Sequence, residues 1–400
     1  MGTTPPITPP IENNMKSVNF IKGQGGLAKT LPGEDHYCGM CFYYDTLPTG
    51  FGELPVKQIL SLPDAESNDI LSTGDFAILH YHIKEFFRVN KNGVLFVGIF
   101  DVPSTTYDFA EINTIQDYSL GKIRQMFVYQ NSVAFATSQV TAIQARIEAA
   151  NGEYKPLEVF YTGDFHAVTN WTTAGDLRAL TAPNVSVIIG QDGGNEGAAL
   201  YTSETVTIGG GGAFLGTISK ALVSENPGWI EKFQMDETEL EIPALANGDL
   251  VKDNKDVLAG LDSKGYIFLY QEIGISGTYW NDSHTCVAVT NDFAQIEINR
   301  TINKAIRGIR TKLLPKLKAT VKVDKATGKL QPAVCKYYES LADKPLEEME
   351  AADELSGGKA YVDVDQNVNS TSKLKVVAKL VPMGINREIE VTIGMSLKLT

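Results

Sequence analysis

This 400-residue sequence has little of what marks disulfide-rich or membrane-spanning proteins. Its 4 Cys are too few for a disulfide framework, and a chain of this length buries a large core without one. No apolar run approaches the roughly 18–20 residues that a spanning helix needs. The first residues lack the basic start and apolar core of a secretory signal. We therefore expect a soluble protein made in the cytoplasm, with two or three domains and no membrane insertion.

Signatures of catalysis and nucleotide binding are also missing. Residues 23–30 end in Lys-Thr like a phosphate-binding loop, but Ala28 stands where such a loop needs Gly. Residues 190–197 follow an apolar run, yet their glycines miss the dinucleotide-binding spacing and two acids lie among them. No nucleophile elbow or zinc-protease helix occurs. The sequence therefore predicts no cofactor and no catalytic residue.

The residues that often bind metals are also poorly placed for it. Cys38 and Cys41 have metal-site spacing, but no second such pair exists, so two thiols in a strand or turn are expected. His80 and His82 lie two residues apart in an expected helix and point to different sides. Residues 363–367 begin like a calcium loop but lack its glycine and distal glutamate. We expect no metal site.

Residues from about 74 to 224 alternate between short apolar runs and amphipathic stretches. Phe76, Leu79, Ile83 and Phe86 at helical spacing predict a helix over 75–90. Short buried strands that alternate with helices indicate a mostly parallel sheet covered by helices, an α/β fold. The expected strands are 94–100, 126–129, 157–161 and 185–189, and the other expected helices are about 137–150, 172–181 and 213–223.

Within the remainder of the α/β region a strand is expected over 266–270, and the residues that follow predict an α+β region. A long helix follows, capped at Thr290, Asn291 or Asp292 and ended by Pro315. A second helix covers about 333–355, and Pro345 should kink or divide it. Strands are expected over 359–365 and 373–381.

The last residues carry the most regular pattern in the chain. Every odd position from 389 to 399 is apolar and every even position is polar or Gly, which predicts a half-buried strand. Its twelve residues would span about 40 Å. So long a strand at a chain end invites aggregation unless it is paired. It either pairs with its own sheet or completes the sheet of a neighbouring copy.

The opposite end is rich in proline and contains one short apolar run. The prolines at 5, 6, 9 and 10 favour an extended chain, and Val18, Phe20 and Ile21 follow them. This stretch is either a disordered tail or an arm that becomes ordered on a partner.

Acidic side chains outnumber basic ones overall, but one segment reverses the balance. The net charge of −13 disfavours general binding to phosphate backbones. The segment from Arg300 to Lys329, however, contains ten Lys/Arg and only one acidic residue, Asp324. This segment is either a solvated helix face or a cationic surface that meets an acidic partner. Nucleic acid is a weaker alternative, because no aromatic residues interleave with the cations for stacking.

Several segments together resemble contractile tail sheath proteins, which occur in myophage-like bacteriophages and related contractile injection particles. The resemblance is strongest in the N-terminal arm and over about 290–400. The segments that carry it are 18–26, 298–307, 363–367, 374–376 and 381–384.

The resemblance implies a domain order and a set of partners. Residues 1–22 would be an N-terminal linking arm, 23–285 an α/β outer and middle region, 286–384 the sheath core domain, and 385–400 a C-terminal linking strand. The implied partners are further copies in a helical homopolymer, the tail tube protein, and baseplate and tail terminator proteins, without direct nucleic-acid binding. The implied location is a virion tail assembled in the bacterial host cytoplasm.

The resemblance also gives roles to particular residues. It implies that the arms add strands to neighbouring subunits and that the basic helix grips an acidic tube. The alternative from the residues alone is an α/β nucleotide-binding protein or enzyme that uses the turns after Phe100 and Ile189. The implied subunit-linking residues are Val18, Phe20, Ile21, Ile389, Val391, Ile393, Met395, Leu397 and Leu399, and the tube-facing candidates are Arg300, Lys304, Arg307, Arg310 and Lys312.

Overall fold

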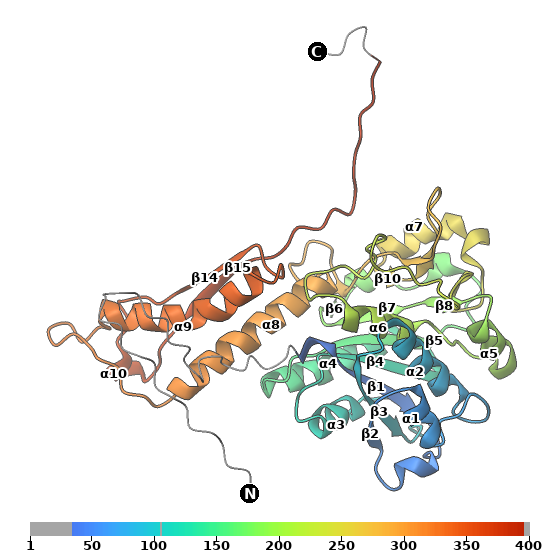
Figure 1. The fold of residues 1–400 in the computed structure, drawn as a ribbon, viewed down its shortest axis with the longest axis horizontal. Helices are drawn as coiled ribbons and strands as arrows, with labels where there is room; N and C mark the ends of the chain where they lie inside the picture. Colours follow the sequence, from blue (N-terminus) through green and yellow to red (C-terminus); the bar gives the residue numbers. More distant parts are fainter. Residues whose placement is uncertain (1–33, 105, 396–400) are drawn as a thin grey trace, which may run out of the picture. The chain divides into compact units, whose positions relative to one another are not determined.

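A seven-stranded sheet is the main feature of the computed structural model, which describes residues 34–104 and 106–395 (Figure 1). Strand β2 pairs antiparallel with β3, and every other pairing in this sheet is parallel. The mostly parallel α/β prediction is confirmed. In the order in which they pair, the strands are β10 (Tyr266–Ile267), β7 (Val185–Ile188), β5 (Glu158–Asp164), β4 (Gln125–Ala134), β1 (Tyr37–Tyr43), β3 (Val94–Phe100) and β2 (Val56–Ile59).

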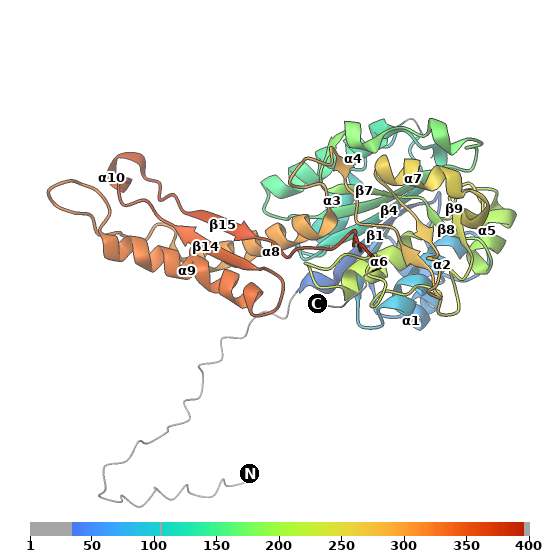
Figure 2. The same ribbon diagram turned by 90° about the horizontal axis from the view of Figure 1, so that it is seen from above.

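Helices cover both faces of this sheet, and each face has its own apolar cluster (Figure 2). The strands are buried on both sides because their sequences are almost continuously apolar, as expected for parallel strands between two helical layers. One face is covered by α1 (Leu62–Ser67), α2 (Ala77–Val89), α5 (Glu196–Glu204) and α6 (Gly211–Lys220), and the other by α3 (Glu111–Tyr118), α4 (Thr137–Gly152) and α7 (Lys255–Ser263).

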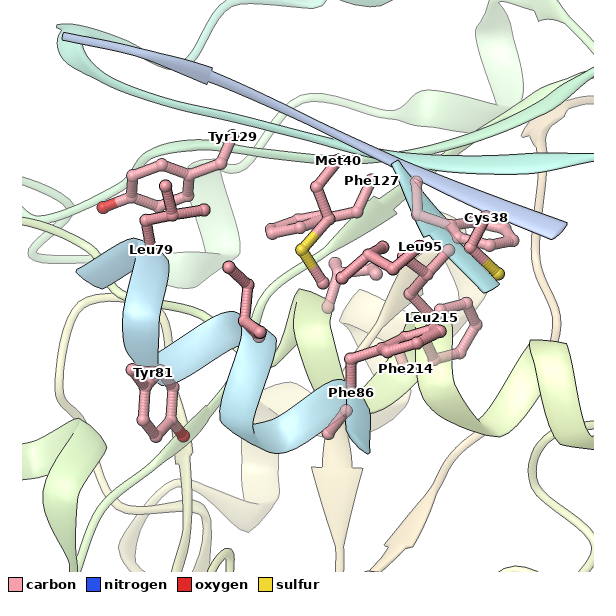
Figure 3. Close-up of a cluster of buried hydrophobic side chains, with 14 of the residues drawn as sticks. Cys38, Met40, Leu79, Tyr81, Phe86, Leu95, Phe127, Tyr129, Phe214 and Leu215 are labelled. Carbon is pink, nitrogen blue, oxygen red and sulfur yellow. The ribbon is translucent and has the colours of Figure 1, made fainter. Parts of the chain in front are cut away.

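Strand β1 shows how the two clusters are separated. Cys38 and Met40 point into the cluster between the sheet and α2 and α6 (Figure 3), whereas Cys41 belongs to the cluster on the opposite face. Because successive side chains in a strand alternate between faces, two residues three apart cannot meet. The Cys38–Cys41 spacing therefore reflects strand geometry, as expected. Burial raises the pKa of the Cys38 thiol to about 12.

Helix α6 packs unusually close to its neighbours. A Cβ atom on Gly211 would lie 2.0 Å from the Phe127 ring, and one on Gly212 would lie 2.3 Å from the carbonyl oxygen of His82. The His82 ring is fully buried here: Nδ1 accepts from the Gly212 amide at 3.2 Å, and Nε2 donates to the Ile208 carbonyl at 3.1 Å. Burial lowers the pKa of His82 to about 3, so it holds this contact as a neutral ring.

Two expectations for the α/β region are wrong. The helix expected over 172–181 is replaced by two short 3-10 turns, because Asn170 and Asp176 accept the amide hydrogens of Thr172 and Arg178 and stabilise turns instead. The strand expected over 266–270 is divided at Phe268. Residues 266–267 join the main sheet as β10, and Leu269–Tyr270 (β11) pairs with Tyr279–Trp280 (β12).

Other short strands form two small sheets beside the main one. These pair β6 (Thr181–Ala182) with β13 (Cys286–Val287) and β8 (Gly190–Asp192) with β9 (Pro243–Leu245).

Two helices and a β-hairpin form the C-terminal region. Helix α8 (Ile296–Leu313) packs against α9 (Pro332–Glu350) through Ala305, Leu346 and Met349. Strands β14 (Gly357–Tyr361) and β15 (Val377–Val381) pair antiparallel, with β14 against α9, and the short helix α10 (Val368–Thr371) lies between them in sequence. The described residues form one compact unit by their contacts, and the expected division at residue 285 stays a prediction.

Both helices of this region differ from expectation in detail. Helix α8 begins after Gln295 instead of at 290–292, because Asn291 caps a turn and accepts the Phe293 amide at 2.9 Å. Pro345 lies inside α9 without dividing it. Its ring fits where α8 has Gly308, since a Cβ atom at Gly308 would lie 2.7 Å from the Cβ atom of Pro345.

Candidate functional site

The first half of α8 lies against the body instead of facing solvent. Arg300 is only 4% exposed, and its guanidinium donates to the carbonyls of Leu222 at 3.0 Å and Ala221 at 3.2 Å, in the loop after α6. The prediction that Arg300 belongs to an exposed cationic face is therefore wrong in this structure. Burial lowers the pKa of the Arg300 guanidinium from its ordinary value. This arginine therefore binds α8 to the loop that follows α6.

Lys304 and Arg307 continue the same stripe of α8 and meet at one carboxylate. The Lys304 ammonium lies 2.6 Å from Asp35 and 2.5 Å from Glu354, and Arg307 lies 2.8 Å from Asp35. Burial alone would raise the pKa of Asp35, but the neighbouring cations hold it below its ordinary value. Asp35 lies in the 3-10 turn Glu34–His36 that directly precedes β1, so these ion pairs join α8 to the start of the central strand.

The same side of α8 covers the amino-terminal ends of adjacent strands. Glu158 begins β5, and its Oε1 accepts from Asn184 at 2.8 Å and from Asn303 of α8 at 2.9 Å. Its Oε2 is buried without a hydrogen-bond partner among the described residues. Burial raises the pKa of Glu158 to about 8, although both amides oppose the rise. A cavity of about 10 Å³ adjoins these groups, which is room for about one water molecule.

The remaining predicted cations lie further along α8. The Arg310 guanidinium stacks 3.6 Å from the centre of the Tyr154 ring, and Lys312 is partly exposed. A tube-facing role for Arg310 and Lys312 stays a prediction. We call the partly or fully exposed lysines from residue 312 to residue 325 the distal basic surface; they are Lys312, Lys316, Lys318, Lys322 and Lys325.

The C-terminal segment is not paired as a strand within the described chain. Residues 386–395 carry no ladder, and Figure 1 draws them as a trace that leads away from β15. The apolar side chains are exposed: Ile389 by 77%, Val391 by 71%, Ile393 by 89%, and Met395 fully. The expectation of a strand that is half-buried on its own sheet is therefore wrong for 389–395, and pairing with a neighbouring copy remains untested. Leu397 and Leu399, like Val18, Phe20 and Ile21, lie outside the described residues.

The two edges of the β14–β15 hairpin differ. The amides of Ala360 on β14 and of Val362 just after it donate to the carboxylates of Asp343 at 2.6 Å and Glu339 at 3.0 Å, both on α9. These two bonds use outward-facing donors at the end of β14. The outer edge of β15 pairs with no strand of the described chain. The hairpin thus presents one closed edge and one open edge.

The turns that a nucleotide would need are occupied by the chain itself. After β8, the Asp192 carboxylate accepts the amides of Gly194 at 3.1 Å, Asn195 at 2.9 Å and Gly197 at 3.1 Å, at the start of α5. A phosphate at this helix start would have to displace that carboxylate. After β3, the Tyr107 ring lies against the Tyr43 ring, with ring centres 4.7 Å apart. The turn after Phe100 therefore leads into packed aromatic side chains.

Residues 34–104 and 106–395 contain no group of three or more His, Cys, Asp or Glu arranged to hold a metal. Across the same residues, no helix combines the length and apolar character needed to cross a membrane.

Comparisons with known proteins identify a family and a fold. Residues 15–284 match the family model described as DUF2586, N-terminal domain, and residues 292–400 match DUF2586, C-terminal domain. No curated protein matches the sequence. One chain of the anti-feeding prophage (AFP) baseplate, determined by cryo-EM, has a similar fold with a TM-score of 0.59 and 13% sequence identity. The match covers 96% of this chain and 100% of that one.

Proposed function

This chain belongs to the DUF2586 family, and from that premise we propose that it is the structural subunit of a contractile tail sheath. Copies of it polymerise helically around an inner tail tube, and the polymer contracts to drive the tube through a target cell envelope. The observation that carries the proposal is the unpaired, alternating C-terminal segment on a fold shared with a baseplate chain of the anti-feeding prophage.

The extent of the fold similarity supports a structural role in a contractile assembly. A doubly covered parallel sheet occurs in many unrelated proteins, so the sheet alone would carry little weight. Here the match covers 96% of this chain, too much for the sheet and its helices alone to account for.

The exposed C-terminal segment supports self-assembly. Burying its four described apolar side chains would contribute on the order of 6–12 kcal/mol before ordering costs, which remove much of it. A strand from one copy that adds to the sheet of another supplies the main-chain hydrogen bonds that this segment lacks. Because donor and acceptor are different parts of the chain, the contact is heterologous and propagates as a ring or open helix.

The open edge of β15 is the acceptor in this proposal. At the end of β14, the amides of Ala360 and Val362 already donate to Asp343 and Glu339, so a further strand there would have to displace two carboxylates. An added strand on β15 displaces no hydrogen bond to another strand of the described chain. The hairpin thereby grows from two strands to three, which suits a stable sheet better than two.

Contraction on this proposal needs no covalent chemistry. Rigid subunits re-dock from one helical packing into another of lower free energy, while the linking segments keep neighbours connected. The distal basic surface contacts the acidic tail tube through individually weak charge pairs, which can release together. The partners are other copies, the tail tube protein, and baseplate and tail terminator proteins.

Electron microscopy of the purified protein tests the proposal directly. The full chain should form rings or hollow tubes, and a truncation that ends at Glu388, which keeps the ion pairs of Arg387 with Asp282 and Glu297, should stay folded but remain monomeric. The point variant is Val391→Asp, which places a charge on the apolar side of the segment. Thr392→Asp is the matched control, because it adds the same charge on the polar side.

Polymers should be lost with Val391→Asp and retained with Thr392→Asp. Polymers of unchanged length from the truncation that ends at Glu388 would overturn the proposed role of the segment. Discrete compact particles from the full chain under all assembly conditions would count against the sheath function itself.

A further inference from the structure

One residue ties the C-terminal segment to the body before the segment becomes exposed. The Arg387 Nε donates to both oxygens of Asp282, at 2.9 and 3.1 Å, and its Nη2 donates to Glu297 Oε1. Asp282 lies in the loop before β13, and Glu297 lies in the first turn of α8. Arg387 therefore joins the C-terminal segment to two residues of the body that precede it by 105 and 90 positions in the sequence.

Asp282 is held in place independently of Arg387, and Glu297 is buried. Asp282 accepts from the Asn226 side chain at 2.6 Å and from the Ser283 amide at 2.8 Å. Glu297 has a side chain only 4% exposed, and its Oε2 has no hydrogen-bond partner among the described residues. Burial raises the pKa of Glu297, and the positive charge of Arg387 opposes that rise.

A buried carboxylate pair of this kind needs a counter-charge. Removing one member of a buried ion pair is strongly destabilising because an uncompensated charge stays behind. The arginine fork supplies charge and geometry together, since two of its nitrogens face two different carboxylates. Lysine has a single nitrogen and would not reproduce that arrangement.

We infer that Arg387, Asp282 and Glu297 form an anchor that sets where the C-terminal segment becomes free and in which direction it leaves the body. This inference rests on the proposed strand addition between copies. Arg387 is a positioning residue on this account, because it does not itself enter the sheet of the neighbour. The exchangeable strand begins at Glu388 instead of at residue 385.

The anchor shortens the free tether. Strand β15 ends at Val381, so without the anchor the free segment would begin six residues earlier. Six extended residues span about 20 Å. Measured to Met395, the free segment lengthens from 8 residues (388–395) to 14 residues (382–395). The effective concentration of a tethered strand falls roughly as the −3/2 power of tether length, so this lengthening lowers it about twofold. Loss of a preferred direction adds to that reduction.

Pulsed electron resonance on the monomer tests the anchor without requiring assembly. Nitroxides are placed at Glu388→Cys, next to the anchor, and at Lys252→Cys on the body, in the full chain at a concentration below assembly. All four native cysteines are buried, so labelling is directed to the new sites. Arg387→Ala should increase the width of the distribution of distances between the two nitroxides at least about twofold. Lys373→Ala, which removes one exposed positive charge elsewhere, should leave it unchanged.

A second variant separates anchoring from folding. Arg387→Ala leaves Glu297 buried without its cation, whereas Arg387→Ala with Glu297→Gln removes that charge as well. The double variant should recover thermal stability but keep the broad distribution, and its assembly should require at least about twofold more protein. A distribution as narrow as that of the unsubstituted chain in both variants would overturn the anchor.

The outcomes distinguish the anchor from the proposed function. A distribution that broadens in a full chain that never polymerises supports the anchor and rejects the sheath function. Normal polymerisation of the full chain together with an unchanged distribution in Arg387→Ala rejects the anchor and leaves the sheath function standing.

Discussion

The first half of α8 and the segment from Lys312 to Lys325 are both rich in cations, but their surroundings are opposite. Arg300, Lys304 and Arg307 lie against the body and bind carbonyls and carboxylates there. Lys312 and the other lysines of the distal basic surface are partly or fully exposed. The comparison teaches that a run of cations is not one functional unit: its first part assembles the protein, and only the later part is available to a partner.

The largest effect should come from Arg300. Arg300→Ala removes the donor for two carbonyls in the loop after α6, and we expect a loss of about 3 kcal/mol in the free energy of unfolding. Urea denaturation followed by tryptophan fluorescence measures this loss. Lys318→Ala, on the distal basic surface, should change the unfolding free energy by less than about 0.5 kcal/mol. Equal midpoints for the two variants would contradict the comparison.

Glu158 should make stability depend on pH. Its pKa is raised from an ordinary value of 4.5 to about 8 in the folded protein, so the folded state binds a proton more tightly than the unfolded state does. Stability from this group is therefore present at low pH and is lost as the pH rises from about 4.5 to about 8. As the pH rises through that window, the free energy of unfolding of Glu158→Gln should increase relative to that of the unsubstituted protein by on the order of 1 kcal/mol per pH unit.

Unfolding curves at about pH 5 and about pH 8, the ends of that window, measure the Glu158 effect. The opposite trend, with Glu158→Gln losing stability relative to the unsubstituted protein as the pH rises, would show that the carboxylate is ionised in the folded state. Asp35 has the reverse sign, because its lowered pKa contributes stability that is lost at acidic pH, below its ordinary value. The two groups can therefore be told apart by their pH windows.

Lys304 should have a smaller effect. Lys304→Ala breaks the pairs with Asp35 and Glu354, but its side chain is 25% exposed, so solvent screening limits the loss to about 1–2 kcal/mol. Lys312→Ala is the matched control on the same helix and should be neutral. If both variants unfolded at the same urea concentration, the ion pairs at Asp35 would contribute nothing measurable.

The smallest effect on stability should come from the distal basic surface. Reversing Lys312, Lys316 and Lys318 to Glu should change the unfolding free energy by less than about 0.5 kcal/mol, yet weaken co-sedimentation with an acidic tail tube. The control with the same change in charge reverses three exposed lysines of the α/β region, Lys91, Lys252 and Lys255. Equal tube binding by both triple variants would reject the tube contact.

Most of the α/β architecture could be predicted from periodicity. Strand β3 and helices α2 and α4 lie within a few residues of their expected positions, because apolar runs and helical spacing are local signals. The errors arise where side chains compete with the backbone. Asn170 and Asp176 stabilise turns where a helix is expected, and Asn291 caps a turn instead of α8.

The candidate site is less predictable. Arg300, Lys304 and Arg307 share one face of α8, which the sequence shows, but their acceptors at Asp35, Leu222 and Glu354 come from three distant segments. The role of Arg387 could not be predicted from the sequence, since a single arginine just before an alternating stretch gives no local signal. Its role depends on Asp282 and Glu297, which lie about a hundred residues away in the sequence.

The sequence alone determined the two-layer covering of a parallel sheet and the alternating pattern of the last residues, because both follow from the spacing of apolar side chains along the chain. Tertiary structure decided which cations are buried, which edge of the hairpin is open and where the C-terminal segment is held. Those outcomes depend on the acceptors that folding brings to each charged side chain, and the free energy of a charge is set by its surroundings more than by its neighbours in sequence.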